Sequence, residues 1–135
     1  MANPNIVAVT KIYGTTTYFA PTGTTAVVLL ANAASSGKVF KINQIVCANV
    51  NGTSAVDATV SIYNNATVTT QGSAPSGGTA FPVVSTVSVP ADASLIAVDK
   101  TTAIYLMEGT SITVTSGTAN GIAFSISYED ITDQP

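Results

Sequence analysis

Histidine, tryptophan and arginine are all absent from this chain of 135 residues, and only 8% of its residues carry a charge. Without histidine the sequence lacks the commonest general base and the commonest metal ligand, which excludes a Ser-His-Asp or Cys-His catalytic site. Its four scattered lysines and net charge of −3 do not form the basic stripe that nucleic-acid binding normally shows. We therefore predict that the protein is not an enzyme, with no catalytic residue, no metal, no cofactor and no nucleic-acid partner.

Cysteine and long apolar runs are also scarce. The single cysteine, Cys47, cannot form an internal disulfide and lies in an apolar run that predicts burial. The longest apolar run, residues 26–31, is far shorter than the ~20 residues that a membrane-spanning helix needs. The first residues lack the basic and apolar regions of a signal peptide. We expect neither a membrane partner nor a secretion signal.

Apolar residues, by contrast, make up 46% of the sequence. A chain this apolar and this poor in charge should fold, because disordered chains combine low hydrophobicity with high charge. Its length suits a single domain over residues 1–135. Because a surface with few charges gives weak protection against association, we expect other proteins to cover much of it in the working state.

Short apolar or alternating runs, each ended by Gly, Pro, Asn or Asp, recur about every ten residues, and β-branched residues are frequent. This spacing predicts an all-β fold, an antiparallel β-sandwich of eight to ten short strands, jelly-roll-like or immunoglobulin-like, with no substantial helix. The predicted strands are 6–12, 15–20, 24–31, 38–50, 58–63, 81–89, 95–98, 101–107, 111–115 and 122–128, with 67–71 as an optional edge strand. Apolar residues on both faces of 38–50 indicate a bulge or a crossing between sheets.

The segments between these strands have their own predicted roles. Residues 1–5 form an N-terminal arm, residues 129–135 an acidic tail, and Asn51-Gly52 a tight turn. The longest loop, 64–78, contains a Gly-rich run without the Gly-Lys-Ser/Thr ending of a phosphate-binding loop, so we interpret it as a flexible connection suited to partner contact. The predicted protein-contact residues are Asn3, Pro4, Asn5, Gly72, Pro75 and Gly77.

Two weaker signals point to ligands. Asp57, Asp92 and Asp99 could meet at one end of a sandwich to hold Ca²⁺, although turn formation explains each of them better. The aromatic residues could form a sugar-binding platform, although packing in the core or at sheet edges needs fewer assumptions. Those aromatic residues are Tyr13, Tyr18, Phe19, Tyr63, Tyr105 and Tyr128.

Six blocks of the sequence carry a resemblance that runs over nearly the whole chain. They are residues 2–7 (ANPNIV), 12–14 (IYG), 34–43 (ASSGKVFKIN), 89–95 (VPADASL), 104–109 (IYLMEG) and 126–131 (ISYEDI). In these blocks, and in their order, the chain resembles the small virion structural proteins of tailed phages that infect marine cyanobacteria.

The resemblance implies a particle component, above all a capsid decoration (cement) protein on the outer surface of the phage head. A neck, tail or fibre component, including a carbohydrate- or host-surface-binding module, is the alternative. The implied partners are the major capsid protein or another virion protein, together with further copies of this chain as a homo-oligomer, a trimer being one option. The implied location is the virion, assembled in the host cytoplasm.

Overall fold

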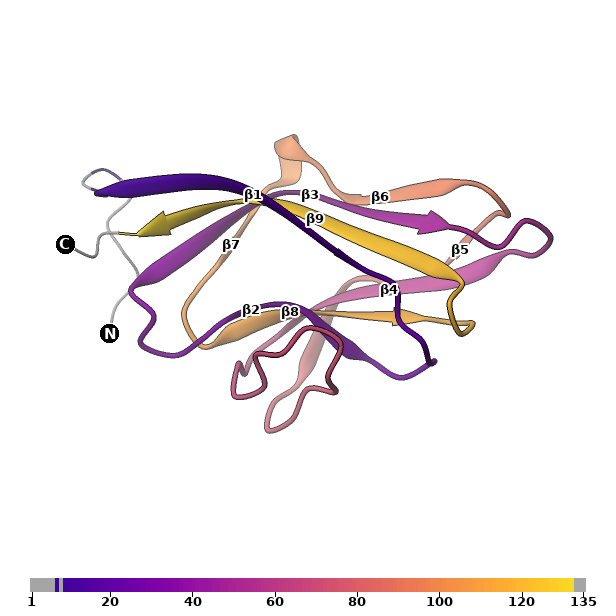
Figure 1. The fold of residues 1–135 in the computed structure, drawn as a ribbon, viewed down its shortest axis with the longest axis horizontal. Coiled ribbons are helices and arrows are strands. Elements are labelled where there is room, and N and C mark those ends of the chain that lie inside the picture. Colours follow the sequence, from indigo (N-terminus) through magenta and orange to yellow (C-terminus); the bar gives the residue numbers. More distant parts are fainter. Residues whose placement is uncertain (1–6, 8, 133–135) are drawn as a thin grey trace.

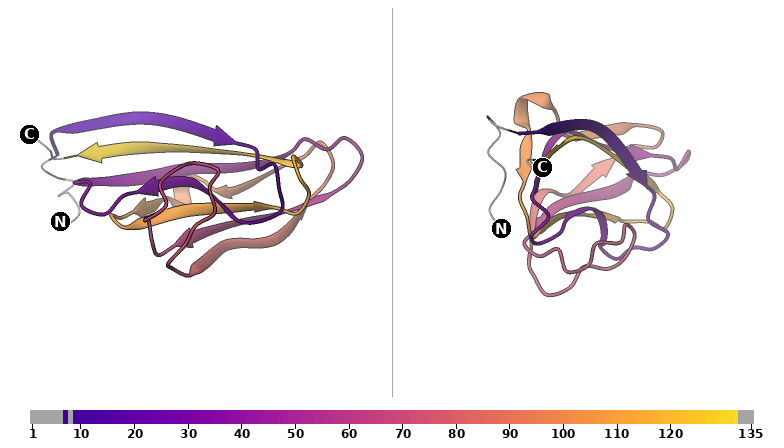
Figure 2. Two further views of the ribbon diagram at one scale, coloured as in Figure 1. Left: turned by 60° about the horizontal axis from the view of Figure 1, so that its bottom comes forward. Right: turned by 60° about the vertical axis from the view of Figure 1, so that its left-hand side comes forward.

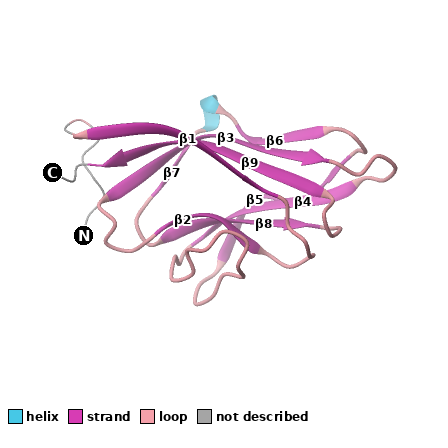
Figure 3. Cartoon of the chain, viewed as in Figure 1, coloured by secondary structure: helices cyan, strands magenta, loops and turns pink. Residues whose placement is uncertain are grey.

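Two antiparallel β-sheets packed face to face make up the computed structural model, which describes residue 7 and residues 9–132 (Figure 1). The first sheet contains, in spatial order, β1 (Lys11–Phe19), β9 (Ile122–Thr132), β3 (Lys38–Asn49) and β6 (Ser94–Val98), with β7 (Ile104–Leu106) also paired to β3. The second contains β2 (Val27–Asn32), β8 (Thr110–Ser116), β4 (Val56–Tyr63) and β5 (Ala80–Val89). The predicted all-β sandwich is therefore confirmed (Figure 3).

The order of pairing is that of a jelly roll. β1 pairs with β9, β2 with β8, β3 with β6 and β7, and β4 with β5, so the chain resembles one long hairpin rolled into two layers. β6 and β7 take the place of one strand beside β3, interrupted by the 3₁₀ turn η1 (Lys100–Thr102). In an immunoglobulin domain the first two strands share a sheet, whereas here β1 and β2 lie in different sheets.

The core lies between the two layers, which Figure 2 shows from two further directions. Alternation along β9 buries Ile122, Phe124 and Ile126, while the intervening small residues face outward. In β3 a register shift between Ile42 and Gln44 lets both Ile42 and Ile45 face the core. The predicted bulge in this double-sided stretch is thus confirmed.

The first strand differs from its prediction. Strands at 6–12 and 15–20 with a turn at Tyr13-Gly14 are wrong, because β1 runs without interruption through both residues. Gly14 pairs directly with Glu129 in β9 and stands in open space, so it takes part in an ordinary ladder. Val7 lies in a turn, and residues 1–6 and 8 are outside the described residues.

The acidic tail predicted at 129–135 is wrong for residues 129–132, which end β9; residues 133–135 are outside the described part. Both carboxylates have partners on β3. Asn43 Nδ2 donates to Glu129 Oε2 at 2.9 Å, and Lys38 Nζ lies 3.3 Å from Asp130 Oδ2. These contacts with a neighbouring strand keep charged residues in a ladder where the sequence alone indicates a solvated tail.

Two other predicted strands are corrected. The optional strand at 67–71 is wrong, since these residues belong to the loop between β4 and β5. The strand predicted at 101–107 shortens to β7, because Asp99 caps η1 and its Oδ1 accepts bonds from the N–H groups of Thr101 and Thr102. A side chain that bonds the backbone locally in this way favours a turn over a strand.

Two buried asparagines tie the strand connections together. The side chain of Asn32 donates through Nδ2 to the backbone carbonyls of Lys38 and Leu106, and its backbone carbonyl accepts from the N–H of Gly109. Asn49 donates to the carbonyls of Ser54 and Val89 and accepts from the N–H of Asn51. Asn51-Gly52 is not a two-residue hairpin. Its Asn51 Oδ1 accepts from Thr53 and Ser54 in a longer connection that crosses from the first sheet to the second.

Candidate interaction surfaces

The side chains of Cys47 and Asp99 have structural roles. Cys47 is fully buried, and this burial raises the pKa of its thiol to about 12, so it packs as a small apolar residue. Hydrogen bonds from Thr101 hold the pKa of Asp99 below its ordinary value. Asp57, Asp92 and Asp99 belong to no group of metal-ligating side chains within residues 7 and 9–132. No helix in this part of the chain has the length and apolarity to cross a membrane.

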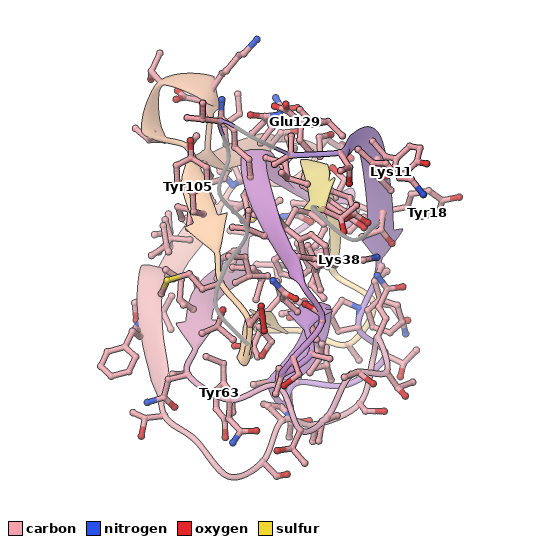
Figure 4. The ribbon with its side chains drawn as sticks, turned by 90° about the vertical axis from the view of Figure 1, so that its left-hand side faces the viewer. Lys11, Tyr18, Lys38, Tyr63, Tyr105 and Glu129 are labelled. Atoms are coloured by element: carbon pink, nitrogen blue, oxygen red, sulfur yellow. The ribbon has the colours of Figure 1, made fainter. Side chains whose placement is uncertain are left out.

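The aromatic residues are spread over separate parts of the fold. Tyr63 is buried and its Oη accepts from the N–H of Gly78, while Tyr128 packs against Phe40 with ring centroids 5.1 Å apart. Burial, with a smaller contribution from Asp130, raises the pKa of Tyr128. Of the exposed tyrosines, Tyr18 and Tyr105 lie at opposite edges of the first sheet (Figure 4). The described aromatic side chains therefore do not converge on one platform.

The long loop between β4 and β5, residues 64–79, is fastened at both ends. The N–H of Asn64 donates to the carbonyl of Thr79, and Asn64 Oδ1 accepts from the N–H of Thr79 at 2.7 Å. Asn65 Nδ2 donates to the carbonyl of Gly77, and Ser111 Oγ donates to the carbonyl of Asn65. The loop is thus a closed surface structure with its own bonds, in contrast to the flexible connection that we expected.

Its middle lies along the edge of β2. The N–H of Val28 donates to the carbonyl of Ser73 at 2.9 Å, and the N–H of Gly72 donates to the carbonyl of Val28 at 2.8 Å. Gln71 Nε2 reaches both the carbonyl of Leu29 and Thr17 Oγ1 in β1. The loop therefore covers an edge of the second sheet and links it to the first.

The predicted contact residues fall into two groups. Asn3, Pro4 and Asn5 lie outside the described residues. Gly72, Pro75 and Gly77 lie on the loop, but they are not equivalent. Gly72 has φ +90° and faces the ring of Phe19, which gives it a packing role. Pro75 is half-buried and Gly77 is exposed, so the outer surface of the loop is formed near residues 74–79.

Three of the four sheet edges are blunted. β2 is covered by the loop, and β6 and β7 are short and separated by η1. β5 contains Pro82 and two register shifts against β4, and Thr86 within it has φ 46°. A proline and bulges on an edge strand are recognised devices against pairing with another chain.

β1, the fourth edge, has no such protection from the described residues, 7 and 9–132. It pairs with β9 alone, over nine residues from Lys11 to Phe19 without a register shift, and it contains no proline. Its exposed side chains include Ile12, Tyr13 and Tyr18, the last at 75% exposure. Pairing of sheet edges between subunits was an expectation from the sequence, but the sequence did not identify β1 as an edge. The signal was the run Thr15-Thr16-Thr17, which gives neither face of the strand a continuous apolar character, as expected of an edge.

Comparison of the chain with protein-family models, with curated proteins and with solved structures finds no match.

Proposed function

We propose that the protein is a structural component of a virion, with capsid decoration on the outer surface of a tailed-phage head as its role. It acts through non-covalent contacts with the major capsid protein or another virion protein and with further copies of itself. The observation that carries this proposal is the combination of a sequence with only 8% charged residues and a sheet edge, β1, whose outer side no described strand covers. The resemblance of six sequence blocks to virion structural proteins supplies the biological setting.

The jelly-roll topology is compatible with this role. Viral capsid domains use this fold, but so do lectins and cupins, so the fold supports the proposal by analogy only. The low charge is the stronger physical argument. Removing charged groups from water at the centre of an interface is costly, and a surface of Thr, Ser, Asn and Gly avoids that cost. Many modest contacts repeated by symmetry then give strong attachment through effective concentration.

Two surfaces are the candidates for attachment. The outer part of the loop, residues 74–79, carries the predicted contact residues Pro75 and Gly77, and β1 offers backbone groups for strand pairing. Neither surface requires a reactive side chain. We therefore propose that the protein has no enzymatic activity.

Labelled antibody on purified phage particles tests the location. The proposal expects label distributed around the head. Label confined to the neck or tail would replace decoration by the alternative, a neck, tail or fibre component. A glycan array then tests whether the exposed Tyr18 contacts a carbohydrate, with Tyr18→Ala as the variant that should lose the signal. Purified particles that contain none of the protein would overturn both the decoration role and the neck, tail or fibre role.

A further inference from the structure

The direction of the backbone groups of β1 follows from the neighbouring ladder. The N–H of Val50 donates to the carbonyl of Gly121 at 3.0 Å. The backbone N–H and C=O of Gly121, just before β9, therefore point toward β3, and so do those of every second residue along β9. Because the N–H and C=O of successive residues point to opposite sides of an antiparallel strand, the groups of Phe124, Ile126 and Tyr128 point toward β1.

Their partners on β1 are Phe19, Thr17 and Thr15. The alternate residues of β1 therefore direct their N–H and C=O away from the sheet. These residues are Ile12, Gly14, Thr16 and Tyr18. Among the described residues no strand lies on this side of β1. Within the described part of the chain, the edge is consequently a regular row of donors and acceptors without backbone partners.

We propose that this edge pairs with β1 of a second copy of the chain, antiparallel and about a two-fold axis, so that the two first sheets become one continuous sheet. In the register that uses every outward group, Ile12 lies opposite Tyr18 of the second copy. Gly14 then lies opposite Thr16 of the second copy, and Thr15 lies opposite Thr15 of the second copy, on the two-fold axis. Such an isologous contact closes on itself and gives a discrete dimer.

The side chains of β1 suit this register. Ile12 is 54% exposed, and an aromatic residue opposite a β-branched one is a favourable cross-strand pair, made twice by the symmetry. The only charged residue of β1, Lys11, lies opposite Phe19 of the second copy in this register. The two Lys11 side chains are therefore at opposite ends of the paired strands. No like charges therefore meet across the edge. A strand of a different protein need not place suitable side chains opposite both Ile12 and Tyr18. A second copy does so by symmetry, because its own Tyr18 and Ile12 lie opposite them.

A cysteine on the proposed axis tests the register. In Thr15→Cys the two Cα atoms would be about 4.5 Å apart, within the range of a disulfide. Tyr13→Cys is the control, since it is on the same face but its two copies would be about 13 Å apart along the strands. Cys47 is buried and does not interfere. Mild oxidation of the full chain should cross-link Thr15→Cys at least tenfold faster than Tyr13→Cys. Equal rates, or no cross-link in either variant, would overturn the proposal.

A charge exchange gives a second test that needs no oxidation. Ile12→Lys with Tyr18→Lys places like charges opposite each other and should leave a monomer in sedimentation velocity. Ile12→Lys with Tyr18→Glu places opposite charges there and should restore the doubled mass. A monomer in both variants and in the unmodified chain at all concentrations would mean that the edge is free or awaits a foreign strand. Because both tests use the purified chain alone, they are independent of the proposed role in a virion.

Discussion

The ring of Phe19 at the end of β1 lies directly over Gly72 in the loop, where an added Cβ atom would come within 2.7 Å of the ring. This contact joins the edge of the first sheet to the segment that covers the edge of the second. Gly72 also has φ +90°, a conformation that other residues adopt only with strain. One glycine therefore serves both the turn of the loop and the close approach of the ring.

Gly72→Ala should lower the free energy of unfolding by about 3 kcal/mol, because it combines left-handed backbone strain with a clash against a ring. Gly23→Ala is the matched control, with nothing within 4 Å of the added Cβ, and should stay within about 0.5 kcal/mol of the unmodified chain. Urea denaturation followed by fluorescence measures both. Similar midpoints for the two variants would show that the close approach of Gly72 to the Phe19 ring does not contribute to stability.

Asn49→Ala should lower the free energy of unfolding by about 2–4 kcal/mol. It leaves the buried carbonyl of Val89 and the partly buried carbonyl of Ser54 without their donor, and such groups are costly when unsatisfied. Asn51→Ala removes bonds in the same connection, but these bonds are exposed to solvent, and their loss should cost about 1 kcal/mol. Thermal unfolding of the two variants compares them directly. An equal loss would contradict the importance that we assign to burial at Asn49.

Stability should fall as the pH rises above 9. The Cys47 thiol has an ordinary pKa of 9.0, which burial raises to about 12 in the folded chain, so between these values only the unfolded chain loses the proton. The free energy of unfolding should therefore drop by up to about 1.4 kcal/mol per pH unit over this window. Cys47→Ala removes this contribution while leaving that of Tyr128 in place. Parallel stability curves for the two proteins between pH 8.5 and 10.5 would show that the thiol is not protected from water.

Local patterns predicted most of the strands because their side chains alternate within a few residues. β9 is the clearest case, with Ile122, Phe124 and Ile126 turned inward as expected. What the sequence could not reveal depends on partners far along the chain. Glu129 and Asp130 read as the start of a tail until Asn43 and Lys38 are placed beside them, 86 and 92 residues away in sequence.

The interaction surfaces were less predictable for the same reason. Whether a strand is an edge depends on the order of strands in the sheet, and β1 meets β9 only because the two ends of the chain come together. Gly72 was correctly placed on a loop, but its packing against Phe19 depends on a contact between distant segments. Asn3, Pro4 and Asn5 lie outside the described residues and stay predictions.

Quantitative mass spectrometry of phage particles purified on a density gradient tests the central proposal most directly. A structural component should copurify with the major capsid protein through successive gradients, in a constant ratio that corresponds to many copies per particle. Loss of the protein during purification, with no fixed ratio to the capsid protein, would contradict a role in the virion.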